Sequence, residues 1–229
     1  MSEYTIEYSA VINPNLYVAI NQSPVYKRWK SNLLENFTVE KIIIHNVFMF
    51  GSRVGFLIVE SLCYDKENGK RVPGIAFLRG DSVSIMPVIK CAGETYTAIV
   101  TEARTPIGNP TQSALPAGMT DGMSFTSAAI KELEEEIGSE FSINENDLKF
   151  LGNFSVTSGG SDEQMGLYFF EKEVQPEVLE KLNGKITGAE GENECIKVSI
   201  IKIDDIKNIA GTDMRSVLSY YLWKEQNDK

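Results

Sequence analysis

The sequence contains few of the residues on which many catalytic sites depend. His45 is the only histidine among 229 residues, and it lies in the strand-like run KIIIHNVFMF, where a packed or edge imidazole is expected. A Ser-His or Cys-His nucleophile and a His-rich zinc site would all depend on this one side chain. The sequence therefore argues against both kinds of site.

Cysteines and apolar runs are also scarce in the patterns that mark secreted or membrane proteins. Cys63, Cys91 and Cys195 are an odd number without metal-binding spacing, so we expect buried thiols in a reducing cytosol. The start of the chain lacks the basic stretch of a secretory signal, and no apolar run reaches the length of a membrane span. We expect a soluble cytoplasmic protein without a membrane partner.

Basic residues are outnumbered by acidic ones, 22 to 32, which gives a formal net charge of −10. Nucleic-acid backbones are bound by clustered Lys and Arg that displace counterions, so no nucleic-acid partner is expected. A small anionic substrate is still compatible with this charge if a metal ion screens it. With 42% apolar residues, the chain can bury a real core.

The order of the expected elements predicts an α/β protein. Ser23-Pro24 is an N-cap and first-turn pair for a helix through VYKRWKSNLLEN, and two strand-like runs flank Gly51-Ser52. Further strand-like runs lie on both sides of one acidic helix. We expect an N-terminal segment with one helix at 1–38, a small antiparallel β-domain at 39–90 and an α/β domain with the acidic helix at 91–229.

The acidic helix lies in the stretch LPAGMTDGMSFTSAAIKELEEEIG, residues 115–138. Ser124 or Thr126 can cap its N-terminus by accepting a backbone N–H bond, and Gly138 supplies its C-terminal stop. At about 100° per residue, one face of this helix is apolar and another carries charge. The apolar face consists of Ile130, Leu133 and Ile137.

The charged face carries Glu132, Glu135 and Glu136, which repel one another in the half of the helix where the dipole also disfavours anions. Mg²⁺ or Mn²⁺ would offset this cost and bridge the carboxylates to a phosphate-bearing substrate. A solvated acidic surface is the alternative interpretation. The PAG loop and Asp121-Gly122, which precede the helix, favour the ion because backbone groups there can reach both metal and phosphate.

The stretch KELEEEIG resembles the Nudix box, G-x5-E-x7-R-E-U-x-E-E-x-G-U, where U is apolar. Lys131 stands in place of the box arginine that orients a glutamate, and Met123 and Ala117 fall where the family has its first Glu and its Gly. Gly118 can lead the box only if the loop is one residue shorter. The segments SPVYKRWKSNLLEN, YTAIVTEARTPIG, LPAGM and SGGSDE also resemble, in order, plant-type ADP-sugar diphosphatases, the ADP-glucose and ADP-ribose pyrophosphatase branch of this family.

This resemblance implies a Nudix α/β/α sandwich preceded by an N-terminal helix and β-domain that builds a homodimer. It also implies Mg²⁺-dependent or Mn²⁺-dependent hydrolysis of ADP-glucose or ADP-ribose to AMP and a sugar phosphate. One alternative is a UDP-sugar or broader nucleotide-sugar diphosphatase, since the base is chosen by contacts that Phe48, Phe50 or Phe77 could supply. Another is a catalytically weakened Nudix module that senses a nucleotide, which the substitutions at Met123 and Lys131 would fit.

The resemblance also implies roles for single residues around the metal. The metal ligands are the carbonyl of Ala117 and the side chains of Glu132 and Glu136, with Glu135 as a further catalytic carboxylate that binds directly or through water. Glu163, in SGGSDE, matches the catalytic carboxylate beside the metal, either as general base or as the group that orients the attacking water. Asp162 is the neighbouring alternative to Glu163, and an ordinary polar turn is the alternative to the motif.

Further matches concern the substrate phosphates. Arg104 matches the arginine that approaches them, and its forked guanidinium suits two oxygens, although a surface salt bridge with Glu102 would also explain it. Arg79 is a weaker match of the same kind. Gly118 and Met119 would present their backbone to the phosphates, and a gap-filling core position is the alternative for Met119. Mobile glycines at 159 and 160 would let the loop close over the substrate.

Overall fold

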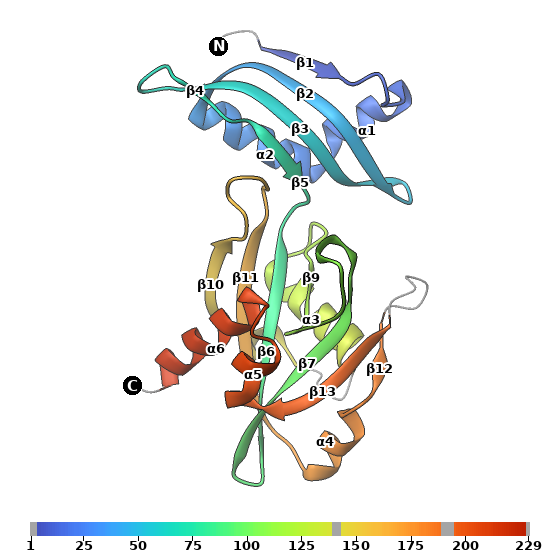
Figure 1. Ribbon diagram of the computed structural model, residues 1–229, viewed down its shortest axis with the longest axis vertical. Coiled ribbons are helices and arrows are strands. Elements are labelled where there is room, and N and C mark those ends of the chain that lie inside the picture. Colours follow the sequence, from blue (N-terminus) through green and yellow to red (C-terminus); the bar gives the residue numbers. More distant parts are fainter. Residues whose placement is uncertain (1–3, 139–142, 189–194, 228–229) are drawn as a thin grey trace. The chain divides into compact units, whose positions relative to one another are not determined.

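The computed structural model describes residues 4–138, 143–188 and 195–227 (Figure 1). The chain forms two compact units. Unit 1 consists of Met1–Asp81 together with Ser155–Gln164, and unit 2 consists of Ser82–Phe154 and Met165–Lys229. Unit 1 is therefore discontinuous, because a short piece from the second half of the chain folds with the first 81 residues.

Unit 1 is a sheet with the strand order β1-β2-β3-β4, in which β5 also pairs with β3. The strands are β1 (Thr5–Tyr8), β2 (Phe37–Phe50), β3 (Arg53–Asp65), β4 (Arg71–Val72) and β5 (Ile75–Leu78), and the helices are α1 (Tyr17–Gln22) and α2 (Pro24–Asn36). The expected antiparallel sheet is present, with β1 added as a parallel edge strand on β2.

The helix α2 begins where the sequence predicts, because the Ser23 side chain accepts a hydrogen bond from the Tyr26 N–H at 3.4 Å and Pro24 occupies the first turn. Tyr26 and Leu33 are buried in one apolar cluster with alternate residues of β2 and β3. Since alternate strand residues share a face, one face of the sheet is covered by the helix.

Unit 2 is a mixed sheet with the order β10-β11-β6-β7-β13-β12, in which β8 pairs with β7 and β9 with β6. Its strands are β6 (Ser82–Cys91), β7 (Glu94–Arg104), β8 (Asn109–Ala114), β9 (Ala117–Met119), β10 (Lys149–Ser155), β11 (Gln164–Glu173), β12 (Ile186–Thr187) and β13 (Ile196–Lys202). Its helices are α3 (Phe125–Glu136), α4 (Pro176–Leu182), α5 (Ile206–Ile209) and α6 (Met214–Asn227).

The centre of unit 2 is β6, which pairs with β7, β9 and β11, and every residue of β6 except Lys90 is buried. A strand buried on both faces needs a layer on each side. These layers are α3 and α6, which both contact β6 (Figure 1). The predicted α/β/α sandwich is thereby confirmed.

The boundaries of these units differ from those expected from sequence, at 38/39 and 90/91. The first boundary is absent because α2 packs on the sheet that follows it, so residues 1–38 are part of unit 1. The second lies at 81/82 because β6 pairs only with strands of unit 2. Local patterns identified β6 as a strand but carry no information on its partners.

Cys63, Cys91 and Cys195 all lie in the described part of the chain and none forms a disulfide. Cys63 and Cys91 are buried as expected, whereas Cys195 is exposed, which corrects the expectation for that thiol. His45 is 43% exposed, with its Nε2 atom 2.9 Å from Glu60 Oε2, as an edge imidazole. Within the described residues, the helices are too short or too polar to cross a membrane.

Candidate active site

The acidic helix α3 has the ends that its sequence predicts. The hydroxyl of Ser124 accepts the Ser127 N–H at 3.1 Å and so caps the N-terminus. The helix ends at Glu136, and Gly138 follows with φ of 119° while its N–H donates to the Leu133 carbonyl at 3.2 Å. Leu133 and Ile137 are fully buried, which fixes the helix rotation and hence the direction of its charged face.

Gly118 lies directly against the carboxyl group of Glu132. A Cβ atom at position 118 would lie 1.9 Å from Glu132 Cδ, far inside the contact distance of two carbon atoms. The close approach of β9 to α3 therefore requires glycine at this position. Gly118, the middle residue of β9, therefore brings the β9 backbone into direct contact with the Glu132 carboxyl group.

Glu136 is the most buried carboxylate of this helix, with 6% of its surface exposed. Its Oε2 atom accepts the Ala117 N–H at 3.2 Å. Burial raises the pKa of Glu136 well above its ordinary value, the charges of Glu132 and Glu102 raise it further, and the Ala117 N–H and Arg104 act in the opposite direction. Glu136 is thus a desolvated acid with two other acids close by.

Glu135 lies at the edge of this group, with 37% of its side chain exposed. Lys131 Nζ is 2.7 Å from Glu135 Oε2 and 3.9 Å from Glu132 Oε1. The hydrogen bond to Glu135 raises the pKa of Lys131. Lysine at this position therefore pairs mainly with Glu135 and approaches Glu132 as a point charge, without the fork of an arginine.

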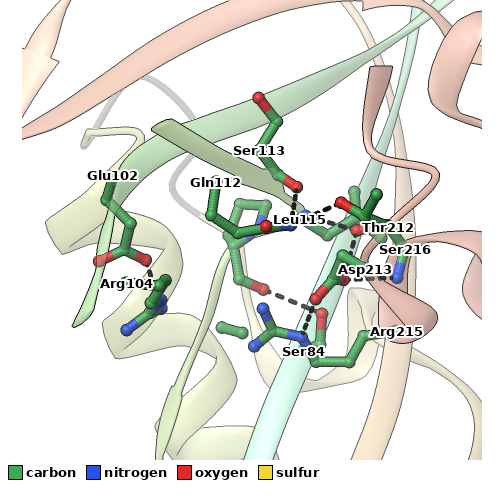
Figure 2. A network of polar contacts seen from close by, with 12 residues as sticks. Ser84, Glu102, Arg104, Gln112, Ser113, Leu115, Thr212, Asp213, Arg215 and Ser216 are labelled. Carbon is green, nitrogen blue, oxygen red and sulfur yellow. Dashed lines mark hydrogen bonds and ion pairs between the residues drawn. The ribbon is translucent and has the colours of Figure 1, made fainter. Parts of the chain in front are cut away.

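Arg104 forms an ion pair with Glu102 on β7, as the alternative interpretation of its sequence position proposed (Figure 2). The Arg104 side chain is 41% exposed and that of Glu102 only 13%. Sequence reasoning used Glu102 only as this partner and missed its proximity to Glu136. The sequence carries no signal for this proximity, because the packing of β7 near α3, seen in the core cluster that holds Val100 and Leu133, is a long-range contact.

The segment before β9 is held by the buried hydroxyl groups of Ser84 and Ser216 (Figure 2). The Leu115 N–H donates to Ser216 Oγ at 2.8 Å, and Ser216 Oγ donates to Asp213 Oδ1 at 2.7 Å. On the other side, Ser84 Oγ donates to the Pro116 carbonyl at 3.1 Å. Ser84 and Ser216 are both fully buried, so these bonds define the position from which Ala117 and Gly118 extend.

The donor set around Glu132 and Glu136 fits a hard divalent cation. Within residues 4–138, 143–188 and 195–227, no three His, Cys, Asp or Glu side chains form a group that could hold a metal by themselves. Mg²⁺ is commonly bound by one or two carboxylates, with water and substrate phosphates completing its shell. Glu132 and Glu136 are crowded, largely buried and close to Gly118. They match a site in which the protein supplies only part of the ligand shell.

The structure shows where Met119 and Met123 lie, but their contacts give neither residue a role. Met119 ends β9 and pairs with Ser82 of β6, where it is half-buried. Met123 is 39% exposed before α3. Asp121 and Gly122, with φ of 50° and 87°, form the turn between β9 and the helix. The role of the Met119 backbone stays a prediction.

Glu163 belongs to unit 1, where it is 6% exposed. Its Oε2 atom lies 3.5 Å from Nη1 of Arg79, which places a predicted phosphate-binding arginine beside the predicted catalytic carboxylate. Asp162, the alternative to Glu163, has a different task. Its carboxylate binds Arg28 and accepts the N–H groups of Arg79 and Gly80 at 2.8 and 3.2 Å, so it is a structural anchor.

The loop with Gly159 and Gly160 is a hydrogen-bonded turn in this structure, and its closure over a substrate stays a prediction. The N–H groups of Gly160 and Ser161 both donate to the Thr157 carbonyl at 2.9 Å. The Gly160 carbonyl accepts the Phe77 N–H at 2.8 Å, which ties the turn to β5. The sequence signal of paired glycines was correct for a turn, but it could not reveal these distant partners.

The fold and the acidic helix together define a class of protein. A helix with a buried glutamate cluster is packed on a mixed sheet and preceded by a glycine-containing strand, β9, and a model of the NUDIX domain matches residues 78–219. The chain belongs to the NUDIX family.

Individual relatives agree with this assignment. The chain is 34% identical over 198 residues to Nudix hydrolase 14, chloroplastic, of Arabidopsis thaliana, a match that covers 78% of this chain and 63% of that relative. The chain thus spans less than two thirds of the relative's length. The structure of an ADP compounds hydrolase matches with a TM-score of 0.58 and 18% identity, covering 84% of this chain and 95% of that one, which supports the fold.

Proposed function

We propose that this protein is a metal-dependent hydrolase that cleaves the diphosphate bond of ADP-sugars such as ADP-glucose and ADP-ribose, releasing AMP and a sugar phosphate. The main support is the buried Glu136, which lies close to Glu132 and Glu102 with a pKa raised well above its ordinary value. Such crowding of acids is costly unless a cation neutralises it. The names of the two similar proteins, a Nudix hydrolase and an ADP compounds hydrolase, agree with the proposal.

Each residue has a separate role in this proposal. Glu132, Glu136 and the Ala117 carbonyl would hold Mg²⁺ or Mn²⁺, with Glu135 at the edge. When bound, the ion supplies positive charge that stabilises the departing phosphate and lowers the pKa of a water molecule. Glu163 accepts the proton of the attacking water or orients that water.

The substrate phosphates are proposed to be bound by Arg104, by Arg79 and by backbone groups of Gly118 and Met119. Arg104 is suited to this because its exposed guanidinium can exchange Glu102 for a phosphate oxygen. Because Gly118 has no Cβ, its backbone lies directly beside Glu132, one of the proposed metal ligands.

The direct test is turnover of ADP-glucose and ADP-ribose with Mg²⁺, by the wild type and by Glu136→Gln and Glu163→Gln. We expect each substitution to lower the rate by about 10²-fold or more, because general-base and metal contributions are of that size. Glu134→Gln is the matched control, since Glu134 is an exposed residue of the same helix. Unchanged rates in both test variants would falsify the assignment.

A nucleotide-sensing NUDIX module is the second candidate function. It is favoured by the preference of Lys131 for Glu135, which leaves Glu132 without the forked partner that an arginine would supply. Calorimetry that finds tight ADP-ribose binding without metal-stimulated hydrolysis would establish this function instead. A panel that includes UDP-sugars separates base preferences, to which the exposed Phe48, Phe50 and Phe77 could contribute.

The assembly and location of the protein stay predictions. A homodimer built through unit 1 is supported by its exposed aromatic residues, Phe48 at 44% and Phe50 at 43% exposure, since exposed apolar side chains of this size favour a partner surface. Sedimentation equilibrium of the wild type tests the dimer, and fluorescent fusion in the source cell tests the cytoplasmic location.

A further inference from the structure

We propose that Arg28 is a positioning residue that fixes the backbone on both sides of Glu163. The inference rests on the catalytic role given to Glu163 above. Arg28 is on α2 and lies 134 residues from Asp162 in the sequence. The two residues nevertheless contact each other in unit 1. Nothing in the local sequence of the helix signals this task.

The guanidinium of Arg28 binds two carboxylates at once. Its Nη2 atom is 2.7 Å from Asp162 Oδ2 and 3.2 Å from the Asp162 carbonyl, and its Nη1 atom forms an ion pair with Asp81. The side chain of Asp162 is only 5% exposed, while that of Arg28 is 33% exposed. A carboxylate buried to this degree needs a permanent positive partner.

Each of these carboxylates is connected to a chain neighbour of Glu163. Asp162 directly precedes Glu163, and its Oδ1 atom accepts the N–H groups of Arg79 and Gly80. Asp81 Oδ1 accepts the N–H of Gln164, the residue that directly follows Glu163, at 3.2 Å. Arg28 therefore connects the residue before Glu163 and the residue after it through one side chain.

The same contacts also place Arg79 against Glu163. Because Asp162 fixes the Arg79 N–H, it fixes the start of the side chain whose Nη1 atom lies 3.5 Å from Glu163 Oε2. The backbone direction and the charged neighbour of Glu163 thus depend on one guanidinium. A displacement of a catalytic group by about 1 Å is enough to reduce a rate by about 10²-fold.

Lysine would not replace arginine here. Two carboxylates and one carbonyl are reached by separate nitrogen atoms of a planar fork, whereas an ammonium group is a single point of charge. We therefore expect Arg28→Lys to keep part of the charge compensation and to lose the geometry. This difference separates positioning from simple charge balance.

The kinetic experiment uses Arg28→Ala and Arg28→Lys in full-length protein, with ADP-ribose and Mg²⁺, at a temperature where circular dichroism shows every variant folded. We expect kcat to fall by about tenfold or more and KM to rise by a smaller factor, since the geometry of the base is altered and Arg79 beside it is also displaced. Lys27→Ala is the control, because Lys27 is an exposed residue of the same helix and carries the same charge.

A double-mutant cycle distinguishes positioning from a general loss of stability. If Arg28 acts through Glu163, then Arg28→Ala has no further effect on kcat when Glu163 is already Gln. An equal fold loss in both backgrounds overturns the proposal, as does an unchanged kcat for Arg28→Ala. If Glu163→Gln alone leaves the rate unchanged, the catalytic role of Glu163 in the proposed function is wrong and the inference fails with it.

Amide hydrogen exchange gives a readout that needs no activity. The N–H groups of Arg79, Gly80 and Gln164 should exchange faster in Arg28→Ala, by about tenfold or more, and stay unchanged in Lys27→Ala. Unchanged exchange at all of these amides contradicts the proposal even if the rate falls. If Arg28→Ala does not fold, Arg28→Lys and Asp162→Asn provide the same two measurements.

Discussion

The two segments that carry the predicted site residues are fixed in different ways. In unit 2, the Leu115–Gly118 segment is held by strand pairing with β6 and by the neutral, fully buried hydroxyls of Ser84 and Ser216. In unit 1, the residues around Glu163 are held by ion pairs to Arg28, whose side chain is one-third exposed.

This difference has physical consequences. The bonds of Ser84 and Ser216 are shielded from salt by full burial, although Ser216 also donates to the charged Asp213, and breaking one of them leaves a polar group without a partner. Partly exposed ion pairs are screened by salt and depend on the geometry of long side chains. The Leu115–Gly118 segment should therefore keep its position at high salt, whereas the residues around Glu163 depend on the charge of Arg28.

The largest expected effect is on metal affinity, which should respond to a change at Glu136 in unit 2 but not to a change at Arg28 in unit 1. Glu136→Gln should weaken Mn²⁺ binding in the absence of substrate by about 10²-fold, because the buried charge that attracts the ion is removed. Arg28→Ala should leave Mn²⁺ affinity within about twofold. Electron paramagnetic resonance titration measures both, and equal losses in the two variants would remove the distinction between the segments.

Gly118→Ala should have the next largest effect. Its Cβ would lie 1.9 Å from Glu132 Cδ, so either β9 or the Glu132 side chain must move. We expect a loss of about 1–3 kcal/mol in the free energy of unfolding, as in other overpacked sites, together with loss of turnover. Gly122→Ala is a useful comparison, because that glycine has open space around it and only its φ of 87° opposes the change.

Ser216→Ala and Asp162→Asn should differ in their response to salt. Each removes a buried hydrogen-bonding partner and should cost about 1–3 kcal/mol in the free energy of unfolding. The cost of Asp162→Asn should shrink between about 0.05 M and about 1 M salt, since Arg28 is partly exposed, whereas the cost of Ser216→Ala should not change. Urea unfolding at both salt concentrations tests this, and parallel salt responses would contradict it.

The smallest effect concerns pH and the raised pKa of Glu136 in the metal-free protein. An acid whose pKa is higher in the folded state than in the unfolded state stabilises the fold below its ordinary value of 4.5. That contribution is lost as the pH rises through the folded-state pKa. Thermal unfolding with a chelator should therefore show a fall in Tm as the pH rises from 4.5 through the folded-state pKa of Glu136, a fall that Glu136→Gln reduces and Glu134→Gln retains.

Local features were predictable from the sequence because they depend on neighbouring residues. The Ser124 cap, the stop at Gly138 and the buried positions Leu133 and Ile137 follow from side-chain chemistry and helix period. The start of α2 after Ser23 follows in the same way. These signals fixed the helix that carries Glu132 and Glu136, and with it the family resemblance.

Long-range partners were not predictable. The Arg28–Asp162 contact joins residues that are 134 positions apart, and no periodicity connects them. The same reason explains why the sequence leaves Asp162 as an alternative to Glu163 and does not place Glu102 beside Glu136. In each case the missing information was which distant backbone or side chain completes the contact.

The discontinuous make-up of unit 1 has a consequence for anyone who wishes to isolate it. A fragment that stops at Asp81 would separate Arg28 from Asp162 and leave the N–H groups of Phe77 and Gly80 without their acceptors from residues 160 and 162. Joining residues 155–164 to Asp81 through a short flexible linker would return those acceptors. The natural route to this unit therefore passes through the synthesis of about half of unit 2, residues 82–154.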